Sequence, residues 1–120
     1  MANISGPDFI TILVSDLKAS FSFYKEKIGL RESAEKRPNA YAFQTKPCGL
    51  AIRQSSDDRK IENPGQGIIL WWRTSDATAL HHDLKKRGVP IVEELRKSPF
   101  GMTFSFQDPD GYVMTVHDGG

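Results

Sequence analysis

The chain has 120 residues, a length typical of one domain and sufficient to bury a core without a disulfide or a structural metal. Its 38% hydrophobic and 26% charged residues are typical of a globular protein, and the net charge of +1 argues against a nucleic-acid or anionic-membrane partner. No apolar run approaches the length needed to span a membrane. The single cysteine, Cys48, and the absence of a basic segment followed by an apolar stretch near Met1 predict a cytoplasmic location.

Two related halves follow one another along the chain. Residues 9–16 (FITILVSD) and residues 69–76 (ILWWRTSD) are both apolar, β-rich runs that end in Ser-Asp. A helix is predicted after each run, because Asp16 and Asp76, or the serines before them, are good N-cap residues. Gly29 and Gly88 are the predicted ends of these helices, since glycine readily adopts the left-handed conformation that stops a helix.

Three strands are expected after each helix. They cover about residues 30–35, 40–45 and 49–54 in the first half, and 90–95, 102–107 and 112–117 in the second. The chain is therefore predicted to be one α+β domain, residues 1–120, built from two tandem βαβββ modules. Module one covers about 7–54, a polar linker about 55–66, and module two about 67–118. Because each module leaves one sheet face bare, the two curved mixed sheets are expected to enclose a cleft.

The order and spacing of these motifs resemble the vicinal-oxygen-chelate superfamily, which includes glyoxalases, bleomycin resistance proteins and dioxygenases. The resemblance covers essentially the whole chain and rests on four motifs, which are Val14-Ser15-Asp16-Leu17, Phe23-Tyr24, Gly29-Leu30 and Asp108-Pro109-Asp110-Gly111. Metal-dependent members bind a divalent ion through four inward-facing side chains, mostly His and Glu. The corresponding positions here are Phe9, Ala51, Ile69 and Thr115, with the register at Ala51 left open. None is a usual ligand of a catalytic ion, so the resemblance implies a protein without a metal site or cofactor.

Alternation along the strands predicts which side chains face the cleft. The predicted lining is mostly apolar and aromatic with a few polar groups, which is typical of a pocket for an organic ligand. The sequence leaves open whether Trp71 or Trp72 faces the cleft, and it favours a core position for Phe104 and Phe106. The predicted ligand-binding residues are Phe9, Thr11, Phe43, Ala51, Arg53, Ile69, Trp71, Arg73, Phe100, Val113, Thr115 and His117.

This lining favours a metal-independent binding protein that sequesters a bulky aromatic natural product or antibiotic, as in the bleomycin-resistance type. The alternative is a metal-free enzyme, an isomerase, lyase or transferase, in which His117 works with Arg53 or Arg73. Whether the protein is an enzyme stays open, although few carboxylates fall at inward positions. A metal-dependent lyase or dioxygenase would require several strands to be out of register at once. The resemblance also implies a homodimer with clefts at its interface.

Overall fold

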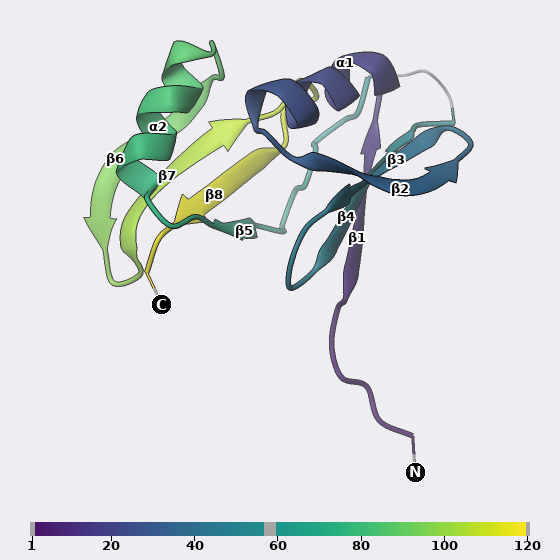
Figure 1. Cartoon of the computed structure of the whole chain (residues 1–120), viewed down its shortest axis with the longest axis horizontal. Coiled ribbons are helices and arrows are strands. Elements are labelled where there is room, and N and C mark those ends of the chain that lie inside the picture. Colours follow the sequence, from purple (N-terminus) through teal and green to yellow (C-terminus); the bar gives the residue numbers. More distant parts are fainter. Residues whose placement is uncertain (1, 57–59, 120) are drawn as a thin grey trace. The chain divides into compact units, whose positions relative to one another are not determined.

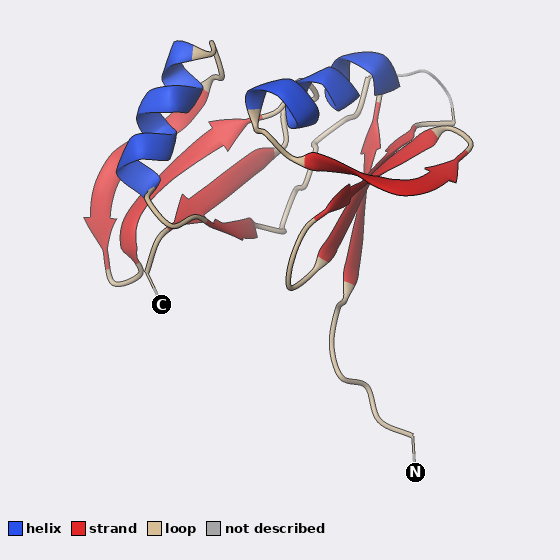
Figure 2. Ribbon diagram, in the orientation of Figure 1, coloured by secondary structure: helices blue, strands red, loops and turns tan. Residues whose placement is uncertain are grey.

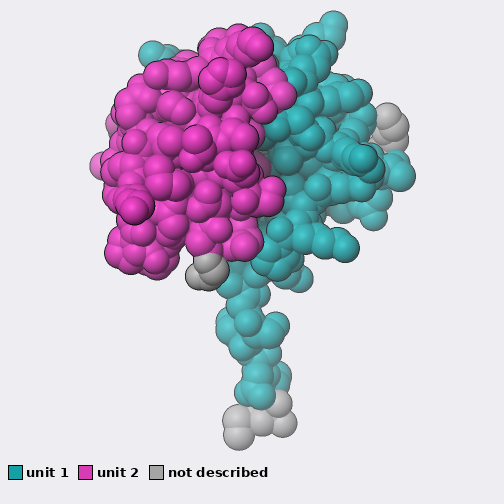
Figure 3. Space-filling view, turned by 60° about the vertical axis from the view of Figure 1, so that its left-hand side comes forward, with its two compact units in different colours: residues 1–61 teal, residues 62–120 magenta. Residues whose placement is uncertain are grey.

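The chain divides into two compact units, Met1–Ile61 and Glu62–Gly120 (Figure 3). The structure, a computed structural model, describes residues 2–56 and 60–119, so residues 57–59 of the expected linker lie outside the described residues. Each unit contains a four-stranded mixed sheet with helical structure on one face (Figures 1 and 2). The element order is β-α-β-β-β in both units, which confirms the predicted α+β fold of two tandem modules.

Unit 1 consists of β1 (Phe9–Val14), α1 (Leu17–Ser22), the π-helical turn η1 (Phe23–Lys27), β2 (Arg31–Arg37), β3 (Ala40–Gln44) and β4 (Gly49–Gln54). Its sheet has the strand order β1-β4-β3-β2, with β1 parallel to β4 and the other pairs antiparallel. Strand β2 begins at Arg31 rather than at the expected residue 30. The reason is that the Leu30 amide donates to the Tyr24 carbonyl and so still belongs to the end of the helix.

Unit 2 repeats this topology with β5 (Leu70–Arg73), α2 (Ala77–Lys86), β6 (Ile91–Ser98), β7 (Gly101–Gln107) and β8 (Val113–His117). Its strand order is β5-β8-β7-β6, and β5 runs parallel to β8. Strand β6 extends three residues beyond its expected end. The extension arises because β6 and β7 stay paired as far as Ser98 and Gly101, where a tight turn joins them.

Equivalent caps begin the two helices. The side chain of Asp16 accepts a hydrogen bond from the Ala19 amide at 3.1 Å, and that of Asp76 accepts one from the Ala79 amide at 3.0 Å. Each carboxylate thereby satisfies a backbone donor that has no partner within the first turn. Of the two predicted alternatives in each Ser-Asp pair, the aspartate is the N-cap, and the repeat in the sequence corresponds to a repeat in structure.

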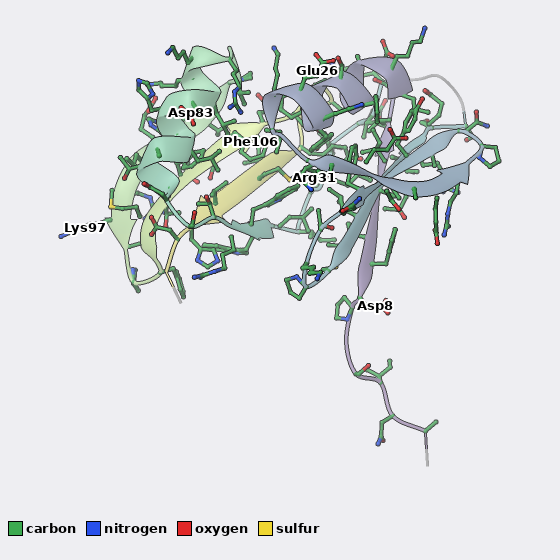
Figure 4. The ribbon with its side chains drawn as sticks, in the orientation of Figure 1. Asp8, Glu26, Arg31, Asp83, Lys97 and Phe106 are labelled. Atoms are coloured by element: carbon green, nitrogen blue, oxygen red, sulfur yellow. The ribbon has the colours of Figure 1, made fainter. Side chains whose placement is uncertain are left out.

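Each unit has its own core between the sheet and the helix. In unit 1 the buried side chains include Ile12, Val14, Ile52 and Tyr24, and in unit 2 they include Leu84, Phe104, Phe106, Met114 and Val116. Phe106 belongs to this packed layer, whereas the charged side chains of Asp83 and Lys97 are exposed (Figure 4). The predicted core positions of Phe104 and Phe106 are confirmed, since both are 1% exposed. In the described part of the chain, no helix is long and apolar enough to cross a membrane.

Candidate functional site

The candidate site of unit 2 lies on the sheet face opposite α2, which we call open face 2. Parallel pairing places Trp71 beside Thr115 and Arg73 beside His117, so all four side chains share this face. Trp71 is 51% exposed there. Trp72 points to the opposite side and packs edge to face on Phe106, with ring centroids 6.2 Å apart. The structure therefore assigns Trp71, not Trp72, to open face 2, together with Ile69 and Val113, which are also exposed.

Three rings gather at one end of open face 2. The ring of Trp71 lies 5.5 Å from that of Phe100 and 5.9 Å from that of His117, measured between centroids, and the Phe100 and His117 rings are 6.5 Å apart. All three pairs are edge to face, an arrangement that the quadrupoles of aromatic rings favour. Trp71 and Phe100 are each about half exposed, so this aromatic cluster offers apolar surface to a ligand.

Residues after β8 hold the aromatic cluster in place. The Asp118 carboxylate accepts hydrogen bonds from the amides of Ala77 and Met102, both at 2.9 Å. The Gly119 amide donates to the Phe100 carbonyl at 2.7 Å, and the Arg73 guanidinium donates to the Gly119 carbonyl. These bonds join the first turn of α2, the β6–β7 turn and the end of β8. The amide of Ala77, followed by that of Met102, lowers the pKa of the Asp118 carboxyl below its ordinary value.

One ring nitrogen of His117, in the aromatic cluster, has no hydrogen-bond partner among the described residues. This nitrogen, Nδ1, is buried. A buried nitrogen without a partner costs free energy, and the burial of this atom keeps it from contact with a ligand in this structure. The other two histidines lie on α2, where His81 contacts Glu94 at 2.8 Å and His82 is exposed.

A row of hydroxyl groups crosses open face 2 beside the aromatic cluster. The Ser105 hydroxyl donates to Glu93 Oε1 at 2.9 Å and lies 3.2 Å from the Thr115 hydroxyl. The Thr103 hydroxyl lies 2.8 Å from that of Ser98. Sequence reasoning missed this row apart from Thr115. The signal was the alternation of Thr103 and Ser105 with the core residues Phe104 and Phe106, which places the two hydroxyl residues opposite the core.

Open face 1, the face of the first sheet opposite α1, is more apolar. The register of β1 and β4 pairs Thr11 with Ala51 and Phe9 with Gly49. As expected, one side of the sheet therefore carries Phe9, Thr11, Ala51 and Arg53. The Phe9 ring lies directly over Gly49, where a Cβ atom would come within 2.5 Å of it. The Arg53 side chain is exposed.

Phe43 does not join the other predicted ligand-binding residues. It pairs with Leu50, which faces α1, and it is only 4% exposed. Its ring lies 6.0 Å from those of Phe21 and Tyr24, measured between centroids. The pleat of the sheet directs Ala42 and Ala51 to open face 1 and therefore directs Phe43 into the core. The prediction that Phe43 contacts a ligand is wrong for this reason.

Comparison with known proteins agrees with the tandem fold. A family model described as "Glyoxalase/Bleomycin resistance protein/Dioxygenase superfamily" matches residues 6–116. The crystal structure of UcmS2 superposes with a TM-score of 0.79 at 21% identity, covering 98% of this chain and 100% of that one. TnmS3, an antibiotic binding protein from Streptomyces sp. CB03234, gives 0.75 at 25% identity with full coverage of both chains. A lactoylglutathione lyase from Agrobacterium tumefaciens gives 0.71 at 16% identity, covering 98% of this chain and 96% of that one.

The residues at the expected metal positions do not fit a divalent ion. Phe9, Ala51 and Ile69 offer no ligand atom, and the Thr115 hydroxyl is already bonded to Ser105. Within the described residues, no three side chains of His, Cys, Asp or Glu come together as a metal site would require.

Proposed function

Because the chain belongs to the Glyoxalase/Bleomycin resistance protein/Dioxygenase superfamily, we propose that it binds and sequesters a bulky aromatic natural product or antibiotic without a metal. The observation that carries the proposal is the half-exposed cluster of Trp71, Phe100 and His117 on open face 2. Exposed aromatic side chains that are fixed in place suit stacking on a planar ligand, because little side-chain entropy is lost when it binds. The likeness to TnmS3 supports the same role.

The proposed binding residues are the predicted ones with Phe43 removed. On open face 2 they are Ile69, Trp71, Arg73, Phe100, Val113, Thr115 and His117, and on open face 1 they are Phe9, Thr11, Ala51 and Arg53. The first set supplies stacking and hydrogen-bonding groups, and the second supplies a mostly apolar surface and one cation. A homodimer and a cytoplasmic location complete the proposal.

The test is calorimetric titration of the protein with metal-free bleomycin, a glycopeptide, and with doxorubicin, a planar polyketide. We expect saturable binding of at least one of them, with the ligand recovered unchanged by mass spectrometry. Trp71→Ala should weaken that binding roughly tenfold or more, the loss expected for an aromatic anchor at a ligand contact. The matched control is Trp72→Phe, since Trp72 lies on the core side of the same strand. It should lower thermal stability and leave the affinity unchanged. Equal affinity in wild-type protein and Trp71→Ala would contradict the proposal.

A metal-free enzyme is the second candidate, and the observation that favours it is the pairing of His117 with Arg73 on open face 2. An imidazole in this position could transfer a proton, and Arg73 on the neighbouring strand could stabilise an anion. Recovery of a chemically altered ligand, abolished by His117→Asn with binding retained, would support the enzyme over the binding protein.

A further inference from the structure

One chain of hydrogen bonds runs across open face 2 from its edge strand to the strand beside Trp71. Glu93, Ser105 and Thr115 are cross-strand neighbours on β6, β7 and β8. Ser105 is fully buried, and its hydroxyl lies 2.9 Å from Glu93 Oε1 and 3.2 Å from the Thr115 hydroxyl. Thr115 in turn lies beside Trp71 in the register of β5 and β8 and remains 7% exposed.

The chemistry of the first group determines the direction of every bond in this chain. Glu93 is exposed, and a carboxylate can only accept hydrogen bonds. The single proton of the Ser105 hydroxyl therefore goes to Glu93. Ser105 can then interact with Thr115 only as an acceptor, so the Thr115 proton points to Ser105. Thr115 is left with oxygen lone pairs and no proton to offer to a ligand.

A second pair of hydroxyl groups on open face 2 has the same direction for an independent reason. The Ser98 hydroxyl donates to the Gly101 carbonyl at 2.9 Å and accepts from the Phe100 amide at 3.0 Å. Its proton is therefore used, and the Thr103 hydroxyl, 2.8 Å away, must donate to it. Thr103 and Thr115 thus both direct their hydroxyl protons toward the β6 side of the sheet. Only the oxygen lone pairs of these two hydroxyl groups remain for other partners.

From the direction of these hydrogen bonds we infer that open face 2 selects aromatic ligands that carry a hydrogen-bond donor at the ring edge that meets Thr115. Such a donor is a phenolic hydroxyl or an aryl N–H. The inference rests on the proposed function and names the ligand class for that site. Trp71 and Thr115 are register neighbours on β5 and β8, so a ring stacked on Trp71 with its edge toward β8 directs its donor at the Thr115 side chain, which is 7% exposed. A ligand that offers only an acceptor there places two lone pairs against each other and loses affinity.

The test compares naphthol with the fluoronaphthalene that has fluorine at the same ring carbon, because fluorine resembles a hydroxyl in size but donates no proton. We expect calorimetry to show at least about tenfold tighter binding of naphthol to the wild-type protein. Thr115→Val should abolish that preference by weakening naphthol alone, and Thr115→Ser should keep it. Equal affinity for the two probes would overturn this inference and leave the proposed function intact. Binding of neither probe by a protein that binds bleomycin or doxorubicin would overturn this inference alone, and binding of none of these molecules would overturn both.

Glu93→Ala changes an exposed position and removes the acceptor of the Ser105 proton. That proton can then turn toward Thr115, which frees the Thr115 proton for the ligand. The preference for naphthol should therefore shrink severalfold although no residue beside the ligand has changed. An unchanged preference in Glu93→Ala would contradict the inference.

A measurement without ligand examines the same point. Neutron diffraction of the deuterium-exchanged protein should place the Thr115 deuteron between Thr115 Oγ1 and Ser105 Oγ. A deuteron on Thr115 Oγ1 that points away from Ser105 would overturn the inference whatever the protein binds.

Discussion

The carboxylate of Asp118 accepts a hydrogen bond from the backbone amide of Ala77, the first residue of α2, at 2.9 Å. This bond joins the end of the last strand to the start of a helix that lies 41 positions earlier in the chain. The other carboxylate oxygen accepts from Met102 at the start of β7. Asp118 therefore fixes the β6–β7 turn that carries Phe100, and it supports the aromatic cluster through backbone hydrogen bonds.

Asp118 should make the protein sensitive to acid. Its pKa is lowered in the folded state by the amides of Ala77 and Met102, so its stabilising contribution is complete above the ordinary value of 3.8. That contribution is lost as the pH falls through the lowered folded pKa. We expect Asp118→Asn to be less stable than the wild type at neutral pH and to show a smaller further loss on acidification. Urea unfolding from neutral pH to about pH 3 measures both effects.

The matched control for Asp118→Asn is Asp8→Asn, since the Asp8 residue is exposed just before β1. This control should follow the wild-type dependence on pH. Parallel curves for Asp118→Asn and the wild type would show that the two backbone hydrogen bonds contribute nothing that depends on ionisation.

Phe43 should matter for folding rather than for ligand contact. Its ring fills the space among Phe21, Tyr24 and Leu50, so Phe43→Ala should lower the free energy of unfolding by about 3–5 kcal/mol. Phe9→Ala, on the exposed side of the same sheet, should cost about 1 kcal/mol or less. Equilibrium unfolding in urea tests the pair, and similar losses for both variants would place Phe43 outside the core.

The two N-caps should be equivalent in energy because they are equivalent in geometry. Asp16→Ala and Asp76→Ala should each lower the free energy of unfolding by about 1 kcal/mol. Asp16→Asn and Asp76→Asn should retain most of the stability, since an amide oxygen can also cap the first turn. Thermal denaturation of the four variants gives the comparison, and a loss confined to one helix would show that the repeat in sequence is not a repeat in energy.

Divalent ions should leave the protein unchanged. After equilibration with Ni²⁺, Co²⁺, Zn²⁺ or Mn²⁺ and gel filtration, we expect far less than one ion per chain by elemental analysis and no rise in the unfolding temperature. The physical reason is that Phe9, Ala51, Ile69 and Thr115 supply no carboxylate, imidazole or thiolate. Retention of one ion per chain, removable by a chelator, would return the metal-dependent reaction to consideration.

Part of the candidate site followed from strand alternation combined with the family resemblance. Alternation predicts that Trp71 shares a face with Arg73 and that Thr115 shares one with His117, and the strand register pairs these residues across β5 and β8, although the sequence left open whether Trp71 or Trp72 faces the cleft. The prediction that Phe43 contacts a ligand was wrong. The side of the sheet that Phe43 faces depends on its pairing with β4, where it lies beside the core residue Leu50. The roles of Asp118 and Glu93 could not be predicted, because their partners are distant in sequence and meet only when the strands pair.

The sequence by itself determined the tandem βαβββ order, the capping of both helices at a Ser-Asp pair and the core positions of Phe104 and Phe106. These features depend on local spacing, on short side-chain oxygens and on the two-residue period of a strand. Only the tertiary structure decided that Trp71 rather than Trp72 is exposed, that Phe100 and His117 gather beside it, and that Ser105 joins Glu93 to Thr115. Each of these depends on which strands become neighbours and in what register, and that is determined by burial of the whole sheet rather than by any one segment.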